Sequence, residues 1–432
     1  MIDLVIRGGR VLDPARDVDR VAHVLVDGGR VVGLADPADA PAARAAVDAH
    51  GLWVTPGLID MHVHLREPGQ EHKETIATGV AAAVAGGFTT LAAMANTTPV
   101  NDDPELTRWM IARAEAAGLA RVLPIAAVTK GLRGEELTDF AALRAAGAVA
   151  FSDDGMPIMN PDVMRRALAQ GRRVGAPVIA HEEDRTLACG GVMHAGPVAD
   201  RLGLPGVPPT AESAMVERDC ALAAATEAHL HVAHISTAAA VAAVRAARAA
   251  GARVTAEAAP HHFTLAADAV ERHGTLAKMN PPLRTDADVA AVRAALGDGT
   301  IAVIASDHAP HHADEKARGM AEAPFGIVGL ETTLGLVLAL VHAGLLALAT
   351  AIRALTIGPA TVLRIAGGHL GAGAVADLTL IDPEARWVVD AAAFRSKSRN
   401  TPFAGMALRG RALAVCLAGR VVDGGLEGRF TR

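Results

Sequence analysis

Short apolar runs broken by glycine and aspartate mark both ends of the chain. The N-terminal runs cover residues 4–6, 11–12, 23–26 and 31–34, and the C-terminal runs cover residues 377–381, 412–417 and 420–422. Between the N-terminal runs, Gly8-Gly9 and Asp27-Gly28-Gly29 are typical of hairpin turns. Because the two ends of a chain often lie close together, the pattern predicts one small β-sandwich domain built from residues 1–54 and 366–432.

Between these ends, short apolar strands alternate with alanine-rich helical stretches. The predicted strands are residues 53–60, 88–93, 122–128, 148–151, 178–180, 230–233, 253–256 and 301–305. Helical patterns separate several of them, at residues 107–117, 161–170 and 238–250. Eight strands alternating with helices predict an α/β fold, a (β/α)₈ TIM-type barrel over residues 55–365.

Composition narrows the class of protein without identifying it. Of the 432 residues, 51% are apolar, which is ample for a large core, and the net charge is −6. This charge argues against a nucleic-acid partner, which needs a basic patch. The apolar run at 334–348 is short for a membrane span and fits a buried helix. The first residues read as a strand without a signal-peptide pattern, and the three cysteines form no disulfide framework. We therefore expect a cytoplasmic protein with no membrane partner.

Metal-binding residue types recur where the predicted strands end. His62 and His64 follow the first barrel strand, and because successive side chains alternate in a strand, both face the same side. The later strand ends carry Asp153-Asp154, His181, His231, His234, Glu257, His261-His262, Asp307-His308 and His311-His312. Barrel active sites form at these C-terminal strand ends. Imidazoles and carboxylates without a nearby cysteine suit one or two Zn²⁺ ions.

Nine sequence segments carry a resemblance to a known family. They are residues 60–69 (DMHVHLREPG), 86–90 (GGFTT), 96–99 (NTTP), 151–155 (FSDDG), 260–262 (PHH), 278–284 (KMNPPLR), 306–311 (SDHAPH), 323–326 (APFG) and 400–403 (NTPF). With these segments the chain resembles the type I dihydroorotases of the amidohydrolase superfamily over nearly its whole length. The His-x-His motif is shared across the superfamily, whereas NPPLR and DHAPH are far more specific.

The resemblance implies a binuclear zinc site. The implied ligands of the first metal are His62, His64 and Asp307, and those of the second are His181 and His234. Asp154 matches the bridging carboxylate, which acts together with a bridging hydroxide, and Asp153 is the alternative. Related hydantoinases and allantoinases bridge their metals with a carbamylated lysine at this point. The absence of a lysine here favours the dihydroorotases.

The resemblance also implies a reaction and a set of substrate contacts. Dihydroorotases catalyse the reversible cyclisation of N-carbamoyl-L-aspartate to (S)-dihydroorotate and water, the third step of de novo pyrimidine (UMP) biosynthesis. In the hydrolytic direction the hydroxide attacks the ring amide, and Asp307 acts as general base and then general acid. The implied substrate contacts are His64, Arg66, Asn96, Asn280, His311, Phe325 and Gly326. Ala95 departs from the proline usual in the family, which would loosen the loop that holds Asn96.

Two other functions stay open at this point. One is a different cyclic amidase, such as a hydantoinase or allantoinase. The other is an inactive dihydroorotase-like scaffold for aspartate transcarbamoylase, although the implied metal ligands are all present. A homodimer, and a complex of an active enzyme with the transcarbamoylase, also fit the resemblance. The segments 190–209 and 310–325 are the candidates for a loop that closes over the substrate. The remaining strand-end histidines, His231, His261, His262, His308 and His312, fit structural roles or roles in orienting the ligands.

Overall fold

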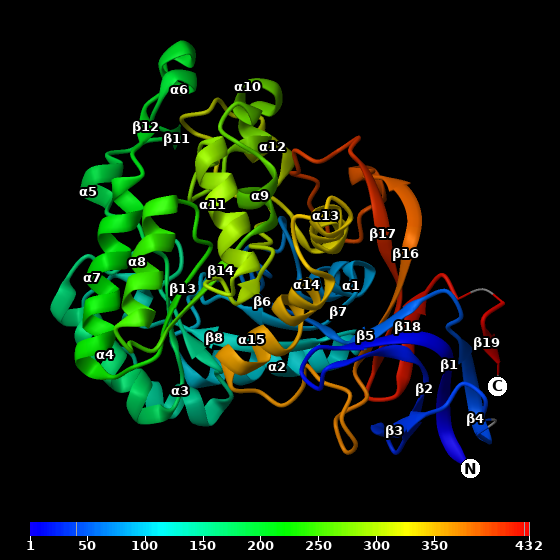
Figure 1. The fold of residues 1–432 in the computed structure, drawn as a ribbon. Helices are drawn as coiled ribbons and strands as arrows, with labels where there is room; N and C mark the ends of the chain where they lie inside the picture. Colours follow the sequence, from blue (N-terminus) through cyan, green and yellow to red (C-terminus); the bar gives the residue numbers. More distant parts are fainter. Residues whose placement is uncertain (40, 427, 432) are drawn as a thin grey trace.

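Two sheets organise the computed structural model, which describes residues 1–39, 41–426 and 428–431. A nine-stranded sheet collects strands from both ends of the chain, and an eight-stranded parallel sheet forms the barrel. Figure 1 shows the first sheet beside the barrel, with the N- and C-termini at the same end of the molecule. The expected barrel accompanied by a sheet from the terminal segments is confirmed.

The terminal sheet branches at its long first strand, which pairs with three others. Strand β1 is antiparallel to β2 and parallel to both β4 and β5. Apolar side chains from both branches, including Ile6, Val47, Val54 and Leu380, share one buried core. The strands are β1 (Ile2–Asp13), β2 (Val18–Asp27), β3 (Arg30–Ala35), β4 (Ala43–Asp48), β5 (Trp53–Pro56), β16 (Leu378–Val388), β17 (Ala407–Leu417), β18 (Arg420–Gly424) and β19 (Phe430–Thr431).

The barrel strands follow one another in chain order around the sheet. They are β6 (Leu58–Val63), β7 (Phe88–Ala93), β8 (Arg121–Ala126), β9 (Ala150–Phe151), β10 (Val178–Ala180), β13 (Leu230–Val232), β14 (Val254–Ala258) and β15 (Val303–Ile304). A parallel bridge between Val63 and His308 brings the last strand back to the first. Every residue of β6, β7 and β10 is buried, as expected for a parallel sheet covered on both faces.

Helices surround the barrel, and most of the shorter elements lie in the loops that follow the barrel strands, whereas η3 lies between β16 and β17 of the terminal sheet. The longer helices are α1 (Ile76–Gly86), α2 (Pro104–Ala117), α3 (Phe140–Ala146), α4 (Pro161–Val174), α7 (Thr210–Thr226), α8 (Ala238–Ala249), α11 (Asp286–Gly297), α13 (Leu330–His342), α14 (Leu348–Leu355) and α15 (Ile357–Leu363). The shorter elements are α5 (Arg185–Ala188), β11 (Met193–His194), α6 (Pro197–Leu202), β12 (Gly206–Val207), α9 (Pro260–Thr264), α10 (Ala269–His273), α12 (Ala313–Lys316) and the 3₁₀ turns η1 (Lys130–Leu132), η2 (Gly274–Ala277) and η3 (Ala391–Ala393).

Local sequence explains where several of these helices begin and end. Helix α2 begins after Asp103, whose side chain accepts a hydrogen bond from the Glu105 N–H, and it has proline at its first position. Helix α4 begins in the same way, after Asn160. Side-chain oxygens at this position satisfy N–H groups that lack a partner within the helix. Both helices end at a glycine with positive φ, Gly118 and Gly175, the conformation that glycine adopts most readily.

Two details of the predicted strands are wrong. The Gly8-Gly9 pair is no hairpin turn but a shift of register within β1, because a Gly-rich bulge and a turn have the same local composition. The predicted strand 53–60 is two strands, β5 in the terminal sheet and β6 in the barrel. Gly57 separates them, and a Cβ atom there would lie 2.2 Å from Thr89 Oγ1. The hairpin at Asp27-Gly28-Gly29, between β2 and β3, is confirmed.

The apolar run at 334–348 lies largely in helix α13, most of whose residues are buried. This helix packs against α1 and β17, so it lies between the barrel and the terminal sheet. Within the described part of the chain, no helix has both the length and the hydropathy of a membrane-spanning segment.

Candidate metal centre

Candidate metal ligands cluster at the C-terminal ends of the barrel strands. His62 lies within β6 and His64 directly follows it, while His181 directly follows β10. Asp154 lies three residues after β9, and His234 lies two residues after β13. Parallel strands bring these positions to one rim, which is where barrel active sites form. All five side chains are buried.

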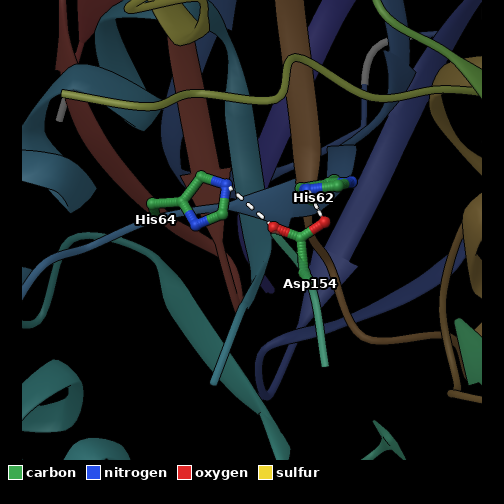
Figure 2. A group of neighbouring side chains, drawn as sticks. All are labelled: His62, His64 and Asp154. Carbon is green, nitrogen blue, oxygen red and sulfur yellow. Dashed lines mark ion pairs between the residues drawn. The ribbon is translucent and has the colours of Figure 1, made fainter. Parts of the chain in front are cut away.

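The first group of ligand atoms comprises His62, His64 and Asp154. The Nε2 atom of His62 lies 3.4 Å from Asp154 Oδ1, and the Nε2 atom of His64 lies 3.5 Å from Asp154 Oδ2. Figure 2 shows the carboxylate between the two rings, with one oxygen directed to each. The three ligand atoms lie within 4.8 Å of one another, so one cation could contact all three.

The second group shares Asp154 with the first. The Oδ1 atom of Asp154 lies 3.6 Å from His181 Nδ1 and 3.5 Å from His234 Nε2. These two ring nitrogens lie 3.0 Å apart. The three ligand atoms again lie within 4.8 Å of one another. Because one carboxylate belongs to both groups, the geometry could accommodate two cations bridged by Asp154.

Unsatisfied polar atoms support a cation at this position. Within the described residues, His62 Nε2 and Asp154 Oδ1 are buried without a hydrogen-bond partner, although they lie only 3.4 Å apart. Buried polar atoms normally have partners, and an exception calls for an explanation such as an ion. Nitrogen and carboxylate donors without a thiolate suit Zn²⁺. The residues present therefore fit the metal that the sequence predicts.

Hydrogen bonds from behind orient both histidines of the His-x-His motif. His62 Nδ1 lies 2.5 Å from Glu257 Oε1, whose second oxygen lies 3.2 Å from His231 Nε2. His64 Nδ1 lies 2.8 Å from Asn96 Oδ1. With each Nδ1 held by an oxygen, both Nε2 atoms are left to face the site, as in metal-bound imidazoles. The sequence places Glu257 at a strand end but does not reveal this role.

The neighbouring aspartates Asp153 and Asp154 have different surroundings. Asp153 Oδ1 accepts hydrogen bonds from the N–H groups of Val128 and Thr129, and its other oxygen accepts one from the Thr129 hydroxyl. Asp153 is therefore satisfied outside the histidine cluster. Asp154 alone of the pair joins both groups of ligand atoms.

Asp307 lies on the His62 and His64 side of the cluster. Its Oδ1 lies 3.2 Å from His64 Nε2 and 3.6 Å from His62 Nε2. The φ angle of Asp307 is +49°, and that of His234 is +28°. Positive φ is uncommon for residues other than glycine and concentrates at functional sites, where the surrounding structure holds the strained backbone.

Charge within the cluster raises the pKa of His62 and His181, whereas burial lowers the pKa of His64. Burial alone would lower the pKa of His181, but hydrogen bonds and charge from Asp154 and Glu183 outweigh it and raise this pKa to about 9. Burial would likewise raise the pKa of Asp154, yet the positive charge of the neighbouring His62 holds it well below its usual range. The cluster thus stabilises positive charge, and a metal cation would displace imidazole protons when it binds.

The predicted substrate contacts line the same rim. Arg66 is buried; its Nε donates to the Pro310 carbonyl oxygen at 3.1 Å, and its Nη2 lies 3.3 Å from His311 Nε2. The same His311 nitrogen lies 2.8 Å from the Phe325 carbonyl oxygen. Asn280 Nδ2 lies 3.2 Å from His181 Nε2 and the same distance from Glu183 Oε2. A compact arrangement of one guanidinium, one imidazole and one amide therefore borders the ligand cluster.

Four of the other strand-end histidines have structural partners, whereas Nε2 of the buried His261 has none among the described residues. His231 Nδ1 lies 2.8 Å from Thr255 Oγ1, in addition to its contact with Glu257. His262 Nε2 lies 2.9 Å from the Pro281 carbonyl oxygen, and His308 Nδ1 accepts a hydrogen bond from the Gly329 N–H. His312 is exposed and caps the short helix α12. None of these four belongs to either group of ligand atoms among the described residues.

Comparisons with known proteins agree with this arrangement. A family described as Dihydro-orotase-like matches residues 51–240. The chain is 52% identical over 421 residues to a dihydroorotase from Anaeromyxobacter dehalogenans, which covers 97% of both chains. It is 50% identical to a dihydroorotase from Geobacter metallireducens, over 98% of this chain and 99% of that one. The solved L-hydantoinase (dihydropyrimidinase) from Arthrobacter aurescens superposes with a TM-score of 0.88 at 25% identity, over 98% and 96% of the two chains. The resemblance in the motifs is thereby confirmed, and the chain belongs to the dihydroorotase family.

Proposed function

We propose that this chain is a zinc-dependent dihydroorotase that interconverts N-carbamoyl-L-aspartate and (S)-dihydroorotate plus water. The observation that carries the proposal is the position of Asp154 in both groups of ligand atoms, in a chain about half identical to named dihydroorotases. Family membership makes the chain a cyclic amide hydrolase of pyrimidine synthesis. The metal, the substrate contacts and the mechanism are our proposal.

The metal ligands in this proposal are His62, His64, Asp154, His181, His234 and Asp307. Bound Zn²⁺ would polarise the ring carbonyl and lower the pKa of water from 15.7 to about 7, which supplies a nucleophile at neutral pH. Glu257 and Asn96 hold the His62 and His64 rings so that each Nε2 faces the site.

Asp307 is the proposed proton carrier of the reaction. Histidine hydrogen bonds and charge outweigh its burial and keep its pKa well below the usual range, so the carboxylate is ionised and able to accept a proton. In the hydrolytic direction Asp307 removes a proton from the attacking water and delivers it to the leaving ring nitrogen. In the biosynthetic direction the same carboxylate removes a proton from the carbamoyl nitrogen that closes the ring and delivers it to the carboxyl oxygen that departs as water.

Substrate recognition in this proposal begins with the carboxylate that both substrates carry. Arg66 offers a guanidinium for it, because such a group can form two parallel hydrogen bonds with a carboxylate. Asn96 and His311 flank this position, and Asn280 faces the ring. The backbone at Phe325 and Gly326 provides polar groups for the ring edge.

The test measures turnover of purified, zinc-loaded protein with dihydroorotate and with N-carbamoyl-L-aspartate, followed by absorbance of the ring amide. Hydantoin and allantoin serve as competing substrates. We expect turnover in both directions with the first pair and a much lower kcat/KM for the other two. Preferential hydrolysis of hydantoin or allantoin would identify a different cyclic amidase. Absence of turnover in protein with both metal sites loaded would contradict the enzyme proposal and favour an inactive scaffold for aspartate transcarbamoylase.

Assembly and location are separate proposals. We propose a cytoplasmic enzyme that forms homodimers and is able to associate with aspartate transcarbamoylase. Light scattering of the chain alone and of its mixture with purified transcarbamoylase measures both associations. The mass of one chain in the first sample would contradict the homodimer. A mixture in which the chain and the transcarbamoylase keep their separate masses would contradict the complex.

A further inference from the structure

Two buried lysines beside the candidate site have no acidic partner among the described residues. Lys278 and Lys316 are 2% and 4% exposed. Among the described residues, neither ammonium group lies within ion-pair distance of a carboxylate, since each Nζ contacts main-chain carbonyl oxygens instead. Burying a charged group is costly unless hydrogen bonds compensate. The hydrogen bonds of these two side chains therefore show which parts of the chain they connect.

Each lysine side chain adds hydrogen bonds between stretches of chain that are also joined by the bond from the Gly326 N–H to the Lys278 carbonyl oxygen at 2.9 Å. Lys316 Nζ donates to the carbonyl oxygens of Pro324 at 2.9 Å, Gly326 at 3.1 Å and Lys278 at 3.3 Å. Lys278 Nζ donates to the carbonyl oxygens of Met320 at 2.5 Å and Ala323 at 2.6 Å. The same ammonium lies 4.4 Å from the centre of the Phe325 ring, a favourable cation–π distance. All these partners except Lys278 lie in residues 310–326.

Asn400 also binds this segment and the residue before it. Its Nδ2 donates to the carbonyl oxygens of Ala309 at 3.0 Å and Gly326 at 3.1 Å, and its Oδ1 accepts from the His311 N–H at 3.1 Å. Gly326 O thus accepts from both Lys316 and Asn400. Asn400 belongs to the NTPF motif, for which the reaction itself supplies no role.

The segment 310–326 carries three of the proposed substrate contacts. His311 lies at its start, and Phe325 and Gly326 lie at its end. Four of its residues, Ala313–Lys316, form helix α12, while the remainder is loop. Loops open more easily than strands and helices, so the placement of these contacts depends on bonds of the kind described above.

We propose that Lys278, Lys316 and Asn400 act as a clamp that positions residues 310–326 around the substrate. This inference rests on the proposed function. These three are positioning residues, because they act through the loop backbone and His311, not through contact with the reacting atoms. Losing one of them would displace groups that bind substrate and transition state alike, so KM would rise while kcat changed little.

A neighbouring cavity makes the clamp accessible to a chemical test. A cavity of about 380 Å³ is lined by Lys316, His311 and Asn400, together with the exposed side chains of Lys397 and Arg399. The exposed members of this lining show that the cavity reaches the surface. A small alkylammonium ion could therefore enter the space left by a shortened Lys316 side chain and donate to the same carbonyl oxygens.

The experiment compares Lys316→Ala and Lys316→Met in zinc-loaded protein, with and without propylammonium. We expect both variants to raise KM for dihydroorotate by about tenfold with kcat within about threefold. Propylammonium should restore KM in the alanine variant but not in the methionine variant, whose side chain fills the same space without a donor. Amide hydrogen exchange across 310–326 should be faster in both variants. Lys397→Ala, which loses one exposed bond to the Glu71 carbonyl oxygen, is the matched control and should resemble wild type.

Wild-type KM and wild-type exchange across 310–326 in both Lys316 variants would overturn the clamp. Recovery of both variants, or of neither, with propylammonium would equally overturn the role of the donated bonds. Hydrogen exchange needs no turnover, so the clamp is tested even if wild-type protein fails to process dihydroorotate. Failure of wild-type turnover alone counts against the proposed function, and failure of the exchange result alone counts against the clamp.

Discussion

Asp307 combines a strained backbone with a carboxylate that contacts both histidines of the His-x-His motif. We predict that Asp307→Asn lowers kcat by about 10²- to 10⁴-fold, the usual contribution of general acid–base catalysis. The substitution keeps the side-chain size and one oxygen, so the protein should retain substantial zinc. Turnover assays combined with zinc determination by mass spectrometry measure both quantities.

Asp314→Asn is the matched control for this substitution. Asp314 lies further along the chain, in helix α12, and its side chain is largely exposed. It should leave kcat and zinc content unchanged. Normal turnover in Asp307→Asn would show that another group carries the proton.

Glu257 offers a second prediction at the scale of single residues. Its carboxylate contacts His62 Nδ1 and His231 Nε2, and groups behind a metal-bound histidine typically contribute 10- to 100-fold to affinity. We expect Glu257→Gln to weaken zinc binding by about that factor in competition with a chelator. The exposed Glu384→Gln, in strand β16, should bind zinc like wild type. Equal zinc affinity in the two variants would show that Glu257 does not contribute to metal binding.

The residues of the candidate site differ in how well their roles can be predicted from the sequence. The strand-end pattern places many metal-binding residue types at one rim, and the family resemblance implies His62, His64, Asp154, His181 and His234 among them, whose ligand atoms do lie together. The role of Glu257 could not be predicted, because its partners lie on other strands and depend on which face each side chain takes. The partners of Lys316 are carbonyl oxygens, which every residue carries, so no sequence pattern marks them.

At the scale of elements, Gly57 separates the strand of one sheet from the strand of the next. A Cβ atom at this position would lie 2.2 Å from Thr89 Oγ1 and 2.9 Å from Thr89 Cβ. We predict that Gly57→Ala lowers the free energy of unfolding by about 1–3 kcal/mol, the range for overpacked cores. Denaturant titration of the metal-free protein measures the change.

Gly33→Ala in strand β3 provides the control, because an added Cβ there meets no atom of the described residues within 4 Å. Its free energy of unfolding should change by much less than that of Gly57→Ala. Equal changes in the two variants would show that loss of glycine flexibility, not the contact with Thr89, decides the outcome.

The bounds of strands with strong apolar patterns could be predicted closely, whereas elements with weak or ambiguous patterns could not be predicted. Strands β7 and β10 match their predicted bounds, since both are short apolar runs that are buried throughout. Strand β4 was not predicted, because its sequence ARAAVD is alanine-rich and lacks the β-branched pattern of a strand. The Gly8-Gly9 pair was misread because only the pairing with β2 distinguishes a bulge from a turn.

For the whole molecule, the barrel brings residues from distant parts of the sequence to one charged centre. His62 and Glu257 are 195 positions apart and in contact, and His64 and Asp307 are 243 positions apart. The terminal sheet and the barrel share the segment around Gly57, which joins β5 directly to β6. Metal binding should therefore stabilise the whole fold, because a ligand that binds only the native state stabilises it.

That stabilisation should depend on pH, because His181 binds a proton more tightly in the metal-free native protein than in the unfolded chain. Its pKa is about 9 in the fold, against a usual value of 6.5. A raised pKa contributes stability that is fully present below pH 6.5 and is lost as pH rises towards 9. Zinc needs the neutral imidazole, so its affinity should rise with pH by up to about tenfold per unit for each proton released.

Thermal unfolding between pH 6.5 and 9, with and without zinc, measures both effects. The Tm contribution of His181 in metal-free protein should fall across this window, while the rise in Tm produced by zinc should grow. His312→Gln, which changes an exposed histidine outside the ligand groups, should keep the same pH dependence, whereas His181→Asn should flatten it. A zinc-induced rise in Tm that is constant from pH 6.5 to 9 would mean that zinc displaces no proton in this range. It would contradict the proposal that zinc replaces a proton on His181.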